Sequence, residues 1–472
     1  MVYDLYKAIG GELMKMGYKT SMFNFIFQAD DELILFNALE GLSSACRVDS
    51  KHRDEVRELL RPGNKVIDSS LSNENIVSLI RKGYLVEEDI DEKQKREALY
   101  TDIIDGSASI LRLIILPTEQ CNYRCKYCYE SFKKGKMPQD IQESVIKYVR
   151  KNIGRYSGLR VSWFGGEPLL AMDVIEHISI NLMDICRKAR RKYISDITTN
   201  GYLLSLENFK KLLSLNVIEY QITIDGTKEI HDTKKPLING DGTFDVVTNN
   251  LRDIKQNIKT STFSIIIRSN VTDEALLSLD DFTAFFDNLL KGDKRFSFFL
   301  RPAGDWGGNN RLSEMLQMRI EENQIGYVYQ NFVKKGYPFN VYTHESFYRP
   351  GGCMCYAAFV NTYVICSDGN IRKCTCELDD DKYSIGKLLA NGSIDIDKLK
   401  SGKWTGNQMR YSPKCDNCAF SPLCFGACCP KVNLCDFADG SREEPKCPSE
   451  MNNIFETLVL IDKCIRFPYL EK

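Results

Sequence analysis

The spacing of the cysteines constrains this chain more than any other feature of its sequence. The chain has 472 residues, with 18 cysteines and only four histidines. One group of cysteines lies within residues 121–128, and a second spans residues 353–447. Because histidine is scarce, clustered thiolates favour iron–sulfur clusters or four-cysteine zinc sites over mixed cysteine–histidine sites. The distribution therefore predicts metal centres in two parts of the chain.

Charge and hydropathy exclude several classes of protein. Lysine and arginine together number 63 and acidic residues 64, so the formal net charge is −1. This balance argues against a nucleic-acid binder that works through a strongly basic surface. No apolar run approaches the roughly 18 residues of a membrane span, and the N-terminus lacks the apolar stretch of a signal peptide. We expect a cytoplasmic protein without membrane contact and without a disulfide framework.

Residues 110–303 alternate apolar, β-rich runs with amphipathic helical segments. Runs that are apolar along most of their length indicate parallel strands buried on both faces. Six such units predict an α/β fold, a partial (β/α)6 barrel of the TIM type, with its chemistry at the carboxyl ends of the strands. The runs are LRLIILPT (111–118), LRVSWFG (159–165), YISDITTNG (193–201), IEYQITIDG (218–226), TFSIIIRSN (262–270) and RFSFFLRPA (295–303).

Distinctive short motifs stand at the ends of the first four runs. They are, in order, CNYRCKYC, GGEP, TNG and DG. In a parallel barrel the carboxyl ends of all strands lie at one face, so these motifs would meet there. This agreement supports the barrel more strongly than any single predicted strand does.

The first cysteine group has the spacing C-x3-C-x2-C and consists of Cys121, Cys125 and Cys128. Three thiolates can hold three irons of a cubane 4Fe–4S cluster and leave the fourth iron open to another ligand. A loop directly after a strand could wrap around one such cluster. The alternatives are a three-cysteine zinc site and three unrelated cysteines.

This region resembles the radical S-adenosylmethionine (SAM) superfamily. CNYRCKYC matches that family's C-x3-C-x-aromatic-C motif, with Tyr127 as the aromatic residue. Gly165, Gly166 and Glu167 match the motif that holds the methionine amino group of SAM. By their own chemistry, the glycines permit close backbone approach and the carboxylate could pair with an ammonium group.

The resemblance implies a particular chemistry. The open iron would chelate the amino and carboxylate groups of SAM, and an electron from the reduced cluster would cleave a C–S bond. The resulting 5′-deoxyadenosyl radical would abstract hydrogen from the substrate, so the cofactor performs the chemistry and the protein orients it. A low-potential electron donor such as flavodoxin or ferredoxin would supply the electron.

Four further positions match the family less closely. Thr223 stands where these enzymes usually have serine, and Arg268 and Asn270 match a motif on the fifth strand near SAM. Lys235, in HDTKKP, stands where an arginine often pairs with the SAM carboxylate. Because lysine lacks the bidentate fork of arginine, either Lys235 makes a single contact or Arg268 takes over. A purely structural role is the alternative for each of the four.

The second cysteine group resembles the SPASM extension of the same superfamily, whose pattern is C-x9–15-G-x4-C, then C-x2-C-x5-C-x3-C, then a last cysteine. A lone C-x2-C would instead be half of a zinc ribbon. The resemblance implies two auxiliary 4Fe–4S clusters, three clusters in all. The first would be held by Cys355, Cys374 and Cys428, with Cys353 as its fourth ligand, and the second by Cys415, Cys418, Cys424 and Cys447.

Some cysteines leave the assignment open. If only one of Cys353 and Cys355 is a ligand, the first auxiliary cluster has an open iron or recruits another residue. We expect the surplus cysteines to be non-ligands, although two of them, Cys376 and Cys429, stand close enough in sequence to confuse the assignment. Cys46 and Cys186 lie apart from both groups and are expected to be small buried hydrophobes. The surplus cysteines are Cys366, Cys376, Cys429, Cys435 and Cys464.

We predict three domains: residues 1–100 as a peptide-recognition domain, 101–345 as the barrel and 346–472 as the SPASM domain. In the first, FNFIFQ and ELILFNAL predict a hairpin, and two helical patterns follow. The charged stretch EEDIDEKQKRE predicts a solvated linker or surface helix. These elements indicate a small α+β, winged-helix-like unit.

In SPASM enzymes that modify ribosomally made peptides, such a unit often grips the leader of the precursor by strand addition. An exposed sheet edge offers unpaired N–H and C=O groups to an extended peptide. We expect the edge to be ELILF, which includes Leu35. A structural cap over the barrel is the alternative.

The expected function is a radical SAM maturase that cross-links a precursor peptide, with a thioether from cysteine as the expected bond and a carbon–carbon bond as a variant. An auxiliary cluster could bind the peptide thiolate or accept an electron. The main alternative is an anaerobic sulfatase maturase, which forms formylglycine. Those enzymes usually place an Asp base directly after the Cys of G-x4-C, where this chain has Thr375. A non-catalytic cysteine-rich or zinc-binding protein is a third possibility.

Overall fold

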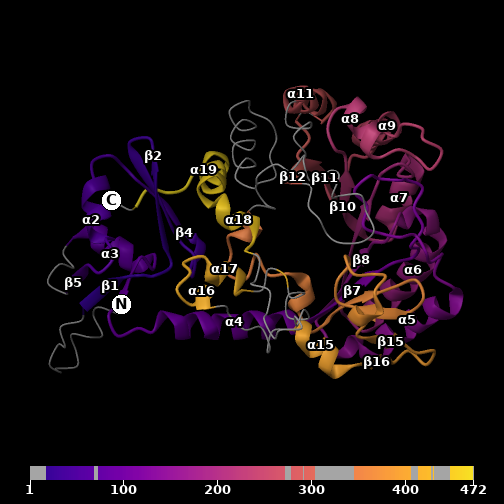
Figure 1. The fold of residues 1–472 in the computed structure, drawn as a ribbon, viewed down its shortest axis with the longest axis horizontal. Helices are drawn as coiled ribbons and strands as arrows, with labels where there is room; N and C mark the ends of the chain where they lie inside the picture. The colour runs from indigo at the N-terminus through magenta and orange to yellow at the C-terminus, as the bar shows by residue number, and fades with distance from the viewer. Residues whose placement is uncertain are drawn as a thin grey trace, which may run out of the picture.

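The computed structural model describes residues 17–67, 73–271, 278–290, 292–302, 345–405, 413–426, 429 and 447–470. Cys428 and Cys435 lie outside the described residues. Figure 1 shows an N-terminal unit and a barrel at opposite ends of the molecule, with the long helix α4 (Glu92–Ala108) running between them. No helix of the described part is long and apolar enough to cross a membrane.

Six parallel strands form the barrel sheet, in the order β12-β11-β10-β9-β8-β7. Each begins within two residues of a predicted run, and helices cover the outer side of the sheet. The predicted partial barrel is therefore confirmed. The strands are β7 (Ile110–Ile115), β8 (Gly158–Trp163), β9 (Lys192–Thr199), β10 (Val217–Thr223), β11 (Ser264–Val271) and β12 (Phe296–Pro302). The helices that follow them include α5 (Gln139–Asn152), α6 (Met172–Lys188), α7 (Leu206–Ser214), α8 (Lys228–Lys234), α9 (Phe244–Asn257) and α11 (Leu279–Leu290).

Burial alternates along these strands, because successive side chains point to opposite faces of the sheet. In β7, Leu111, Leu113 and Ile115 are fully buried in the core between sheet and helices. The alternate positions are only half-buried, and on β8 to β11 most of them carry polar groups. Arg160 on β8, for example, forms ion pairs with Asp196 on β9 and Glu219 on β10. The inner side of the barrel is thus polar rather than a second apolar core.

The sheet continues beyond β7 into the cysteine-rich region. Strand β13 (Thr362–Ile365) pairs in parallel with β7, and three short antiparallel strands follow it, β14 (Asn370–Arg372), β15 (Gly386–Leu388) and β16 (Ile394–Ile396). An open barrel leaves the outer edge of its first strand unpaired, and β13 covers that edge. This pairing brings residues 355–374 beside the start of the barrel.

The N-terminal unit contains two small antiparallel sheets. One has the order β5-β1-β6, and the other is the meander β2-β3-β4. The predicted hairpin is confirmed as β2 and β3, joined by a turn in which Asp30 has φ 53°. The strands are β1 (Gly17–Thr20), β2 (Asn24–Ala29), β3 (Glu32–Asn37), β4 (Gly41–Val48), β5 (Lys65–Ile67) and β6 (Leu85–Glu87), and the helices are α2 (Arg53–Leu59) and α3 (Glu74–Arg81).

The expected docking edge was wrong. Leu35 lies on β3, which pairs with both β2 and β4 and is therefore the central strand of its sheet. Its side chain is fully buried. The strong apolar character of ELILF reflects this central position, because both faces of β3 are covered. The outer strand β4 is itself covered in part: the Arg47 amide donates to the Pro468 carbonyl (2.8 Å), and the Leu470 amide donates to the Arg47 carbonyl (2.7 Å).

Two cysteines apart from the clustered groups behave as predicted. Cys46 and Cys186 are buried among apolar side chains in the N-terminal core and the barrel core, respectively. Burial raises the pKa of each thiol to about 11. Both are therefore protonated, inert thiols near neutral pH.

Helix α4 joins the N-terminal unit to the cysteine-rich region. Near its start, the Glu92 carboxylate accepts hydrogen bonds from the Ser21 hydroxyl (2.5 Å) and the Met22 amide (3.0 Å). One turn later the Arg96 guanidinium donates to the Cys415 carbonyl (3.2 Å) and the Ser421 hydroxyl (3.0 Å). Arg96 is 2% exposed. The charged stretch is therefore a buried connection on one face, which its charge alone did not indicate.

Replacing Arg96 with Met should lower the free energy of unfolding by about 3 kcal/mol, because buried oxygen acceptors would lose a charged donor. The matched control is Lys95→Met at an exposed neighbouring position, which should change it by less than about 0.5 kcal/mol. Urea titrations of anaerobically prepared protein would measure both values. Equal stability of the two variants would show that the connection does not depend on this guanidinium.

Candidate functional site

The loop that carries the first cysteine group is held by a second segment of the barrel. Main-chain bonds join the loop to residues 234–238: the Arg124 amide donates to Pro236 (2.9 Å) and the Ile238 amide to Asn122 (3.0 Å). This pairing explains how a loop with no regular structure of its own keeps a fixed path. Residues 234–238, which include the end of the HDTKKP stretch, therefore support the cysteine loop through main-chain hydrogen bonds.

The sulfur atoms of this loop are too widely spaced for one zinc ion. Tetrahedral zinc with bonds of about 2.3 Å requires sulfur atoms about 3.8 Å apart. Among the described residues, no three cysteine sulfurs lie within 4.8 Å of one another. A cubane, whose irons are spread over a larger volume, does not require sulfur atoms this close together. Burial also raises the pKa of Cys128 to about 12, a cost that a bound cationic centre would offset.

The two glycines of GGEP let this turn lie directly against the cysteine loop. Gly165 has φ +115°, and a Cβ there would stand 2.3 Å from the Thr118 carbonyl oxygen. A Cβ on Gly166 would stand 2.4 Å from the Gln120 carbonyl oxygen. The Glu167 amide also donates to Gln120 (2.9 Å). Only glycine permits this approach of two backbones.

The Glu167 carboxylate is fully buried and bonded within the chain. One of its oxygens accepts from the Thr199 hydroxyl (2.7 Å) and the Leu169 amide (3.0 Å), and the other accepts from the Asn200 amide (2.8 Å). It therefore ties the end of β8 to the end of β9. Three donors of the chain already bond to this carboxylate. The pairing with an ammonium group that the sequence suggested is therefore not the role of Glu167 in this structure.

Tyr127 is the centre of a polar network at the carboxyl ends of β10 and β11. Its hydroxyl donates to Asp225 and accepts from Lys235 Nζ (3.1 Å) and Asn270 Nδ2 (3.2 Å). Asp225 is fully buried and also accepts from the Asn270 amide (2.8 Å). Burial and the neighbouring Asp225 carboxylate hold the pKa of Tyr127 well above its usual value. The network fixes the ring of Tyr127 beside the cysteines.

A second cation lies next to this network. Arg268 pairs in register with Thr223 on the neighbouring strand, and its Nε donates to Asn270 Oδ1 (3.2 Å). Burial, and then repulsion from Arg301, lowers the pKa of Arg268. The barrel mouth therefore gathers the positive charges of Lys235 and Arg268, which suits a carboxylate ligand. Arg301 already pairs with the Glu450 carboxylate (2.6 Å).

Three residues of the site were not singled out as ligands or contacts from the sequence. Asp225 belongs to the DG motif at the end of the fourth strand, so its position was a signal that could have identified it. Asn200, of the TNG motif, donates to Asn122 (2.8 Å) within the cysteine loop. Glu130 is half-buried, its Oε2 atom is buried without a hydrogen-bond partner in the described part, and burial raises its pKa to about 8.

The second cysteine group divides between two places. Cys355 and Cys374 pack against the barrel core, whereas Cys353 packs with Cys424 and Cys418 in another core. Cys424 also lies near Cys415 and Cys447. The four cysteines expected at the second auxiliary cluster are thus neighbours, while Cys353 and Cys355 stand apart. Cys428 lies outside the described residues.

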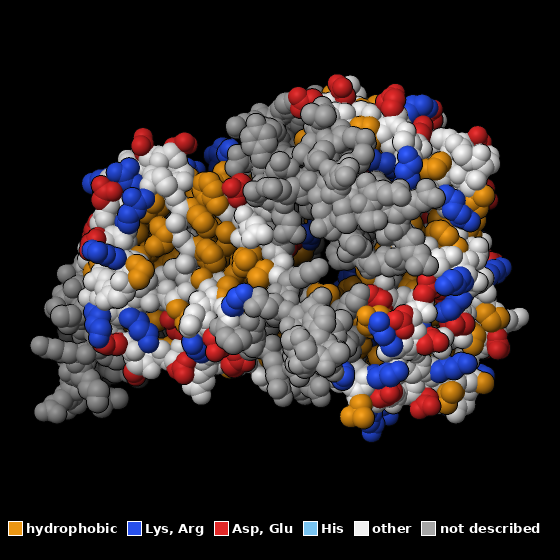
Figure 2. Space-filling view, viewed as in Figure 1, with side chains coloured by type: hydrophobic (Ala, Val, Ile, Leu, Met, Phe, Trp, Pro, Cys, Tyr) orange, Lys and Arg blue, Asp and Glu red, His pale blue; other side chains and the backbone are white. Residues whose placement is uncertain are grey.

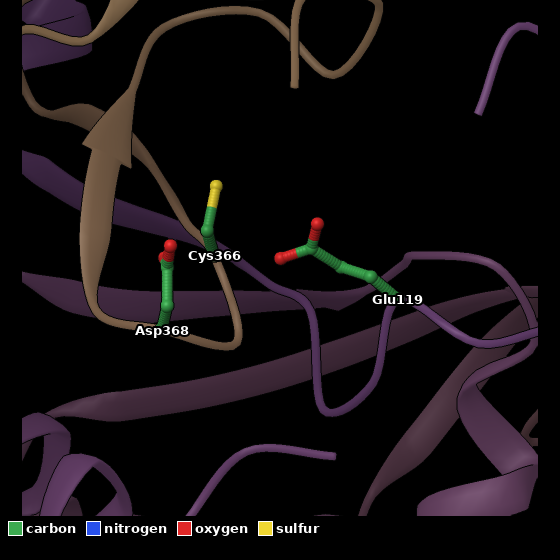
Figure 3. Close-up of side chains that lie close together, drawn as sticks. All are labelled: Glu119, Cys366 and Asp368. Atoms are coloured by element: carbon green, nitrogen blue, oxygen red, sulfur yellow. The ribbon is translucent and has the colours of Figure 1, made fainter. Parts of the chain in front are cut away.

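A group of possible metal ligands near the barrel has a different explanation. Figure 3 shows Glu119, in the loop after β7, facing Cys366 and Asp368 from the turn after β13. The Glu119 carboxylate accepts two hydrogen bonds from Ser367, and Lys134 Nζ lies 3.1 Å from Asp368 and 3.8 Å from Glu119. The lysine ammonium already supplies the positive charge. Through these ion pairs the group joins the loop after β7 to the turn after β13.

Residues 115–283 match the family model of the radical SAM superfamily. These residues contain the cysteine loop, the GGEP turn and the Tyr127 network. The chain therefore contains a radical SAM domain. A radical SAM domain implies a 4Fe–4S cluster and SAM, and the residues described above fit both.

Two curated relatives are identical to this chain at about a quarter of their aligned residues. The radical SAM cyclopropyl synthase TigE of Paramaledivibacter caminithermalis is 25% identical over 309 residues, which cover 55% of this chain and 64% of that protein. The chain thus spans less than two thirds of that relative's length. A cysteine-type anaerobic sulfatase-maturating enzyme of Clostridium novyi is 24% identical over 374 residues, which cover 73% of this chain and 92% of that enzyme.

The fold also matches a solved structure. Native anSMEcpe with bound AdoMet and Kp18Cys peptide superposes with a TM-score of 0.55 at 20% identity, covering 74% of this chain and 96% of that one. At this level of identity the likeness shows a shared fold. It agrees with the parallel barrel described above.

Replacing Gly166 with Ala should remove about four irons per chain, because the new Cβ would displace the Gln120 carbonyl and with it the cysteine loop. Gly135→Ala is the matched control, since a Cβ there meets nothing within 4 Å. Iron and sulfide assays of anaerobically purified protein would measure the loss. Full iron content in Gly166→Ala would show that the close approach of the two loops is not needed for cluster binding.

Proposed function

We propose that this radical SAM enzyme is a peptide maturase that installs a cross-link, a thioether from a cysteine of the substrate, in a precursor peptide held by the N-terminal unit. The observation that carries the proposal is the combination, in one chain, of the cysteine loop with its buried supports and a sheet edge suited to an extended peptide. With the cluster and SAM bound, the cofactor supplies hydrogen abstraction from the substrate, and a low-potential donor such as flavodoxin or ferredoxin supplies the electron.

The chain's own residues would orient SAM. Cys121, Cys125 and Cys128 would hold three irons. The main chain of Gly165 and Gly166 would lie along the methionine portion, because the Glu167 carboxylate is already bonded inside the protein.

Arg268 is better suited than Lys235 to meet the SAM carboxylate. The Lys235 ammonium already donates to Tyr127 and is only 5% exposed. Arg268 offers a fork of donors beside the same network. Thr223 and Asn270 would line the same wall, since both stand at the carboxyl ends of paired strands.

We further propose two auxiliary 4Fe–4S clusters in the cysteine-rich part, which makes three clusters in all. The neighbouring positions of Cys415, Cys418, Cys424 and Cys447 support the second. Cys355 and Cys374, which pack together against the barrel, support the first.

The proposed docking edge for the precursor's leader is the outer edge of β2. Among the described residues, β2 pairs only with β3. The Ala38 amide donates to the Phe23 carbonyl, so odd-numbered residues of β2 bond to β3 and even-numbered ones direct their main-chain groups outward. Ile26 therefore offers its N–H and C=O to an added strand.

Aromatic side chains beside this edge would receive apolar residues of a leader. Phe25 and Phe27 stack with ring centroids 6.0 Å apart, and Phe27 lies 5.2 Å from Phe455 of α19 (Ile454–Ile465). All three rings are half-buried. Figure 2 shows hydrophobic side chains gathered between the N-terminal unit and α19. An apolar patch next to a free strand edge suits strand addition with side-chain specificity.

Formylglycine formation is the second candidate, because sulfatase-maturating relatives align over most of their length. The residue at position 375 favours formation of a cross-link over formation of formylglycine. The Thr375 hydroxyl shares a hydrogen bond with Tyr356 (2.9 Å), and the Thr375 amide donates to the same phenol (2.9 Å). A buried hydroxyl bonded in this way offers no carboxylate base of the kind expected for those enzymes.

The first prediction from this proposal concerns the metal content. Anaerobic preparations should contain about 12 irons per chain, and Cys121/Cys125/Cys128→Ala should contain about eight and cleave no SAM. The control is Cys46→Ala, which lies in the N-terminal core and should keep all irons. Undiminished SAM cleavage in the triple variant would rule out the assigned SAM site.

A second prediction concerns the strand edge. Ile26→Pro should abolish peptide binding and modification, because proline removes the outward N–H, yet leave iron content and peptide-independent SAM cleavage unchanged. Ile26→Ala is the matched control: it also loses the side chain but keeps the N–H, so it should bind. If folded Ile26→Pro bound and modified the peptide as well as Ile26→Ala does, β2 would not be the docking edge.

The reaction product separates the two candidate functions. A thioether forms when a C–H hydrogen and the thiol hydrogen leave and a C–S bond closes, so the peptide loses two hydrogens and keeps its sulfur. Formylglycine formation from cysteine instead removes the sulfur. Mass spectrometry of a cysteine-containing precursor peptide from a neighbouring reading frame would distinguish them, and a product without its sulfur would contradict the cross-link.

A further inference from the structure

The two cysteines of GGCMCYAA face different parts of the protein. The Cys353 amide donates to the Leu423 carbonyl (2.9 Å), and the Gly351 amide donates to the Pro422 carbonyl (3.0 Å). These bonds fix the turn against α17 (Ser421–Cys424). A Cβ on Gly352 would stand 2.0 Å from the Ser346 carbonyl oxygen, so the turn has no room to rearrange. Cys353 is therefore held on the side of Cys424 and away from Cys355.

The contact made by the Cys353 sulfur is that of a thiol. Its Sγ lies 3.3 Å from the Phe347 carbonyl oxygen, an acceptor to which it can only donate. A cluster ligand is a thiolate and has no hydrogen to donate. A thiolate at this position would face the negative end of the carbonyl dipole. The observed contact thus disfavours Cys353 as a ligand.

A different cysteine stands beside the other expected ligands of the first auxiliary cluster. Tyr356, next to Cys355, is joined by two hydrogen bonds to Thr375, which lies between Cys374 and Cys376. The Cys376 amide donates to Cys374 Sγ (3.4 Å), as amides do to cluster sulfurs. The Cys376 side chain contacts that of Cys374 and lies near Cys355.

We propose that Cys376, and not Cys353, completes the ligand set of the first auxiliary cluster, together with Cys355, Cys374 and Cys429. This inference rests on the proposed auxiliary clusters. Cys429 lies near Cys355, so it can reach the same cluster. The C-T-C stretch 374–376 thereby supplies two ligands from one turn.

This ligand set also sets the position of the cluster relative to the SAM site. Cys376 is in side-chain contact with Tyr129, the second residue after Tyr127 and the neighbour of Cys128. A cluster held by Cys376 therefore lies against the loop that carries the SAM-binding cysteines. A cluster held by Cys353 would be drawn toward α17 and the second auxiliary group instead.

The test is electron paramagnetic resonance of oxidised full-length protein. Because the SAM-binding cluster also has an iron without a protein ligand, Cys121/Cys125/Cys128→Ala serves as the background. In that background, Cys376→Ala should lose one iron on mild oxidation and gain a 3Fe–4S signal of about one spin per chain. Cys353→Ala should show the background spectrum and keep about eight irons.

The other possible outcomes would contradict the proposal. A 3Fe–4S signal in Cys353→Ala, with Cys376→Ala unchanged, would overturn the proposal, and so would unchanged spectra in both variants. If Cys376→Ala fails to fold by circular dichroism, Cys376→Ser decides: the proposal expects a shifted signal of the reduced cluster, and an unshifted one contradicts it. A background that holds only about four irons would instead refute the pair of auxiliary clusters, and so the underlying proposed function.

Discussion

The functional end of this protein depends on how the loop after β7 is clamped between two other segments. On one side, residues 234–238 bond to the loop through main-chain groups. On the other, Gly165 and Gly166 bring a second turn within contact of Thr118 and Gln120. Neither support could exist without the parallel order of β7, β8 and β10, because that order places the three strand ends at one face. The cysteines are thus positioned by the barrel rather than by their own loop.

Two buried carboxylates, those of Glu167 and Asp225, hold the neighbouring strand ends of the site together. Glu167 is satisfied by three donors from neighbouring strand ends, and Asp225 by Tyr127 and Asn270. Removing a carboxylate from water is costly unless it is fully bonded, so these two residues lock their partners into one arrangement. The cations Lys235 and Arg268 remain at the edge of this network. The result is a rigid wall that carries positive charge beside the cysteine loop.

The sequence predicted the parts of the fold that depend on local pattern. Six apolar runs located the starts of the barrel strands to within two residues, and motifs at their ends located the site. It failed where the outcome depends on distant partners. ELILF was expected to be an edge because its composition cannot tell which strands pair beside it, and Leu35 proved central. The pairing of β13 with β7, and the burial of Arg96 against the Cys415 carbonyl, likewise join residues far apart in the chain.

The central claim is that the loop of Cys121, Cys125 and Cys128 holds a cluster with one iron open to SAM, among others that are closed to it. The most direct measurement is the electron paramagnetic resonance spectrum of the reduced protein before and after SAM is added. The account predicts that one component of the spectrum shifts on addition of SAM while the others stay unchanged. A spectrum in which SAM shifts no component would contradict it.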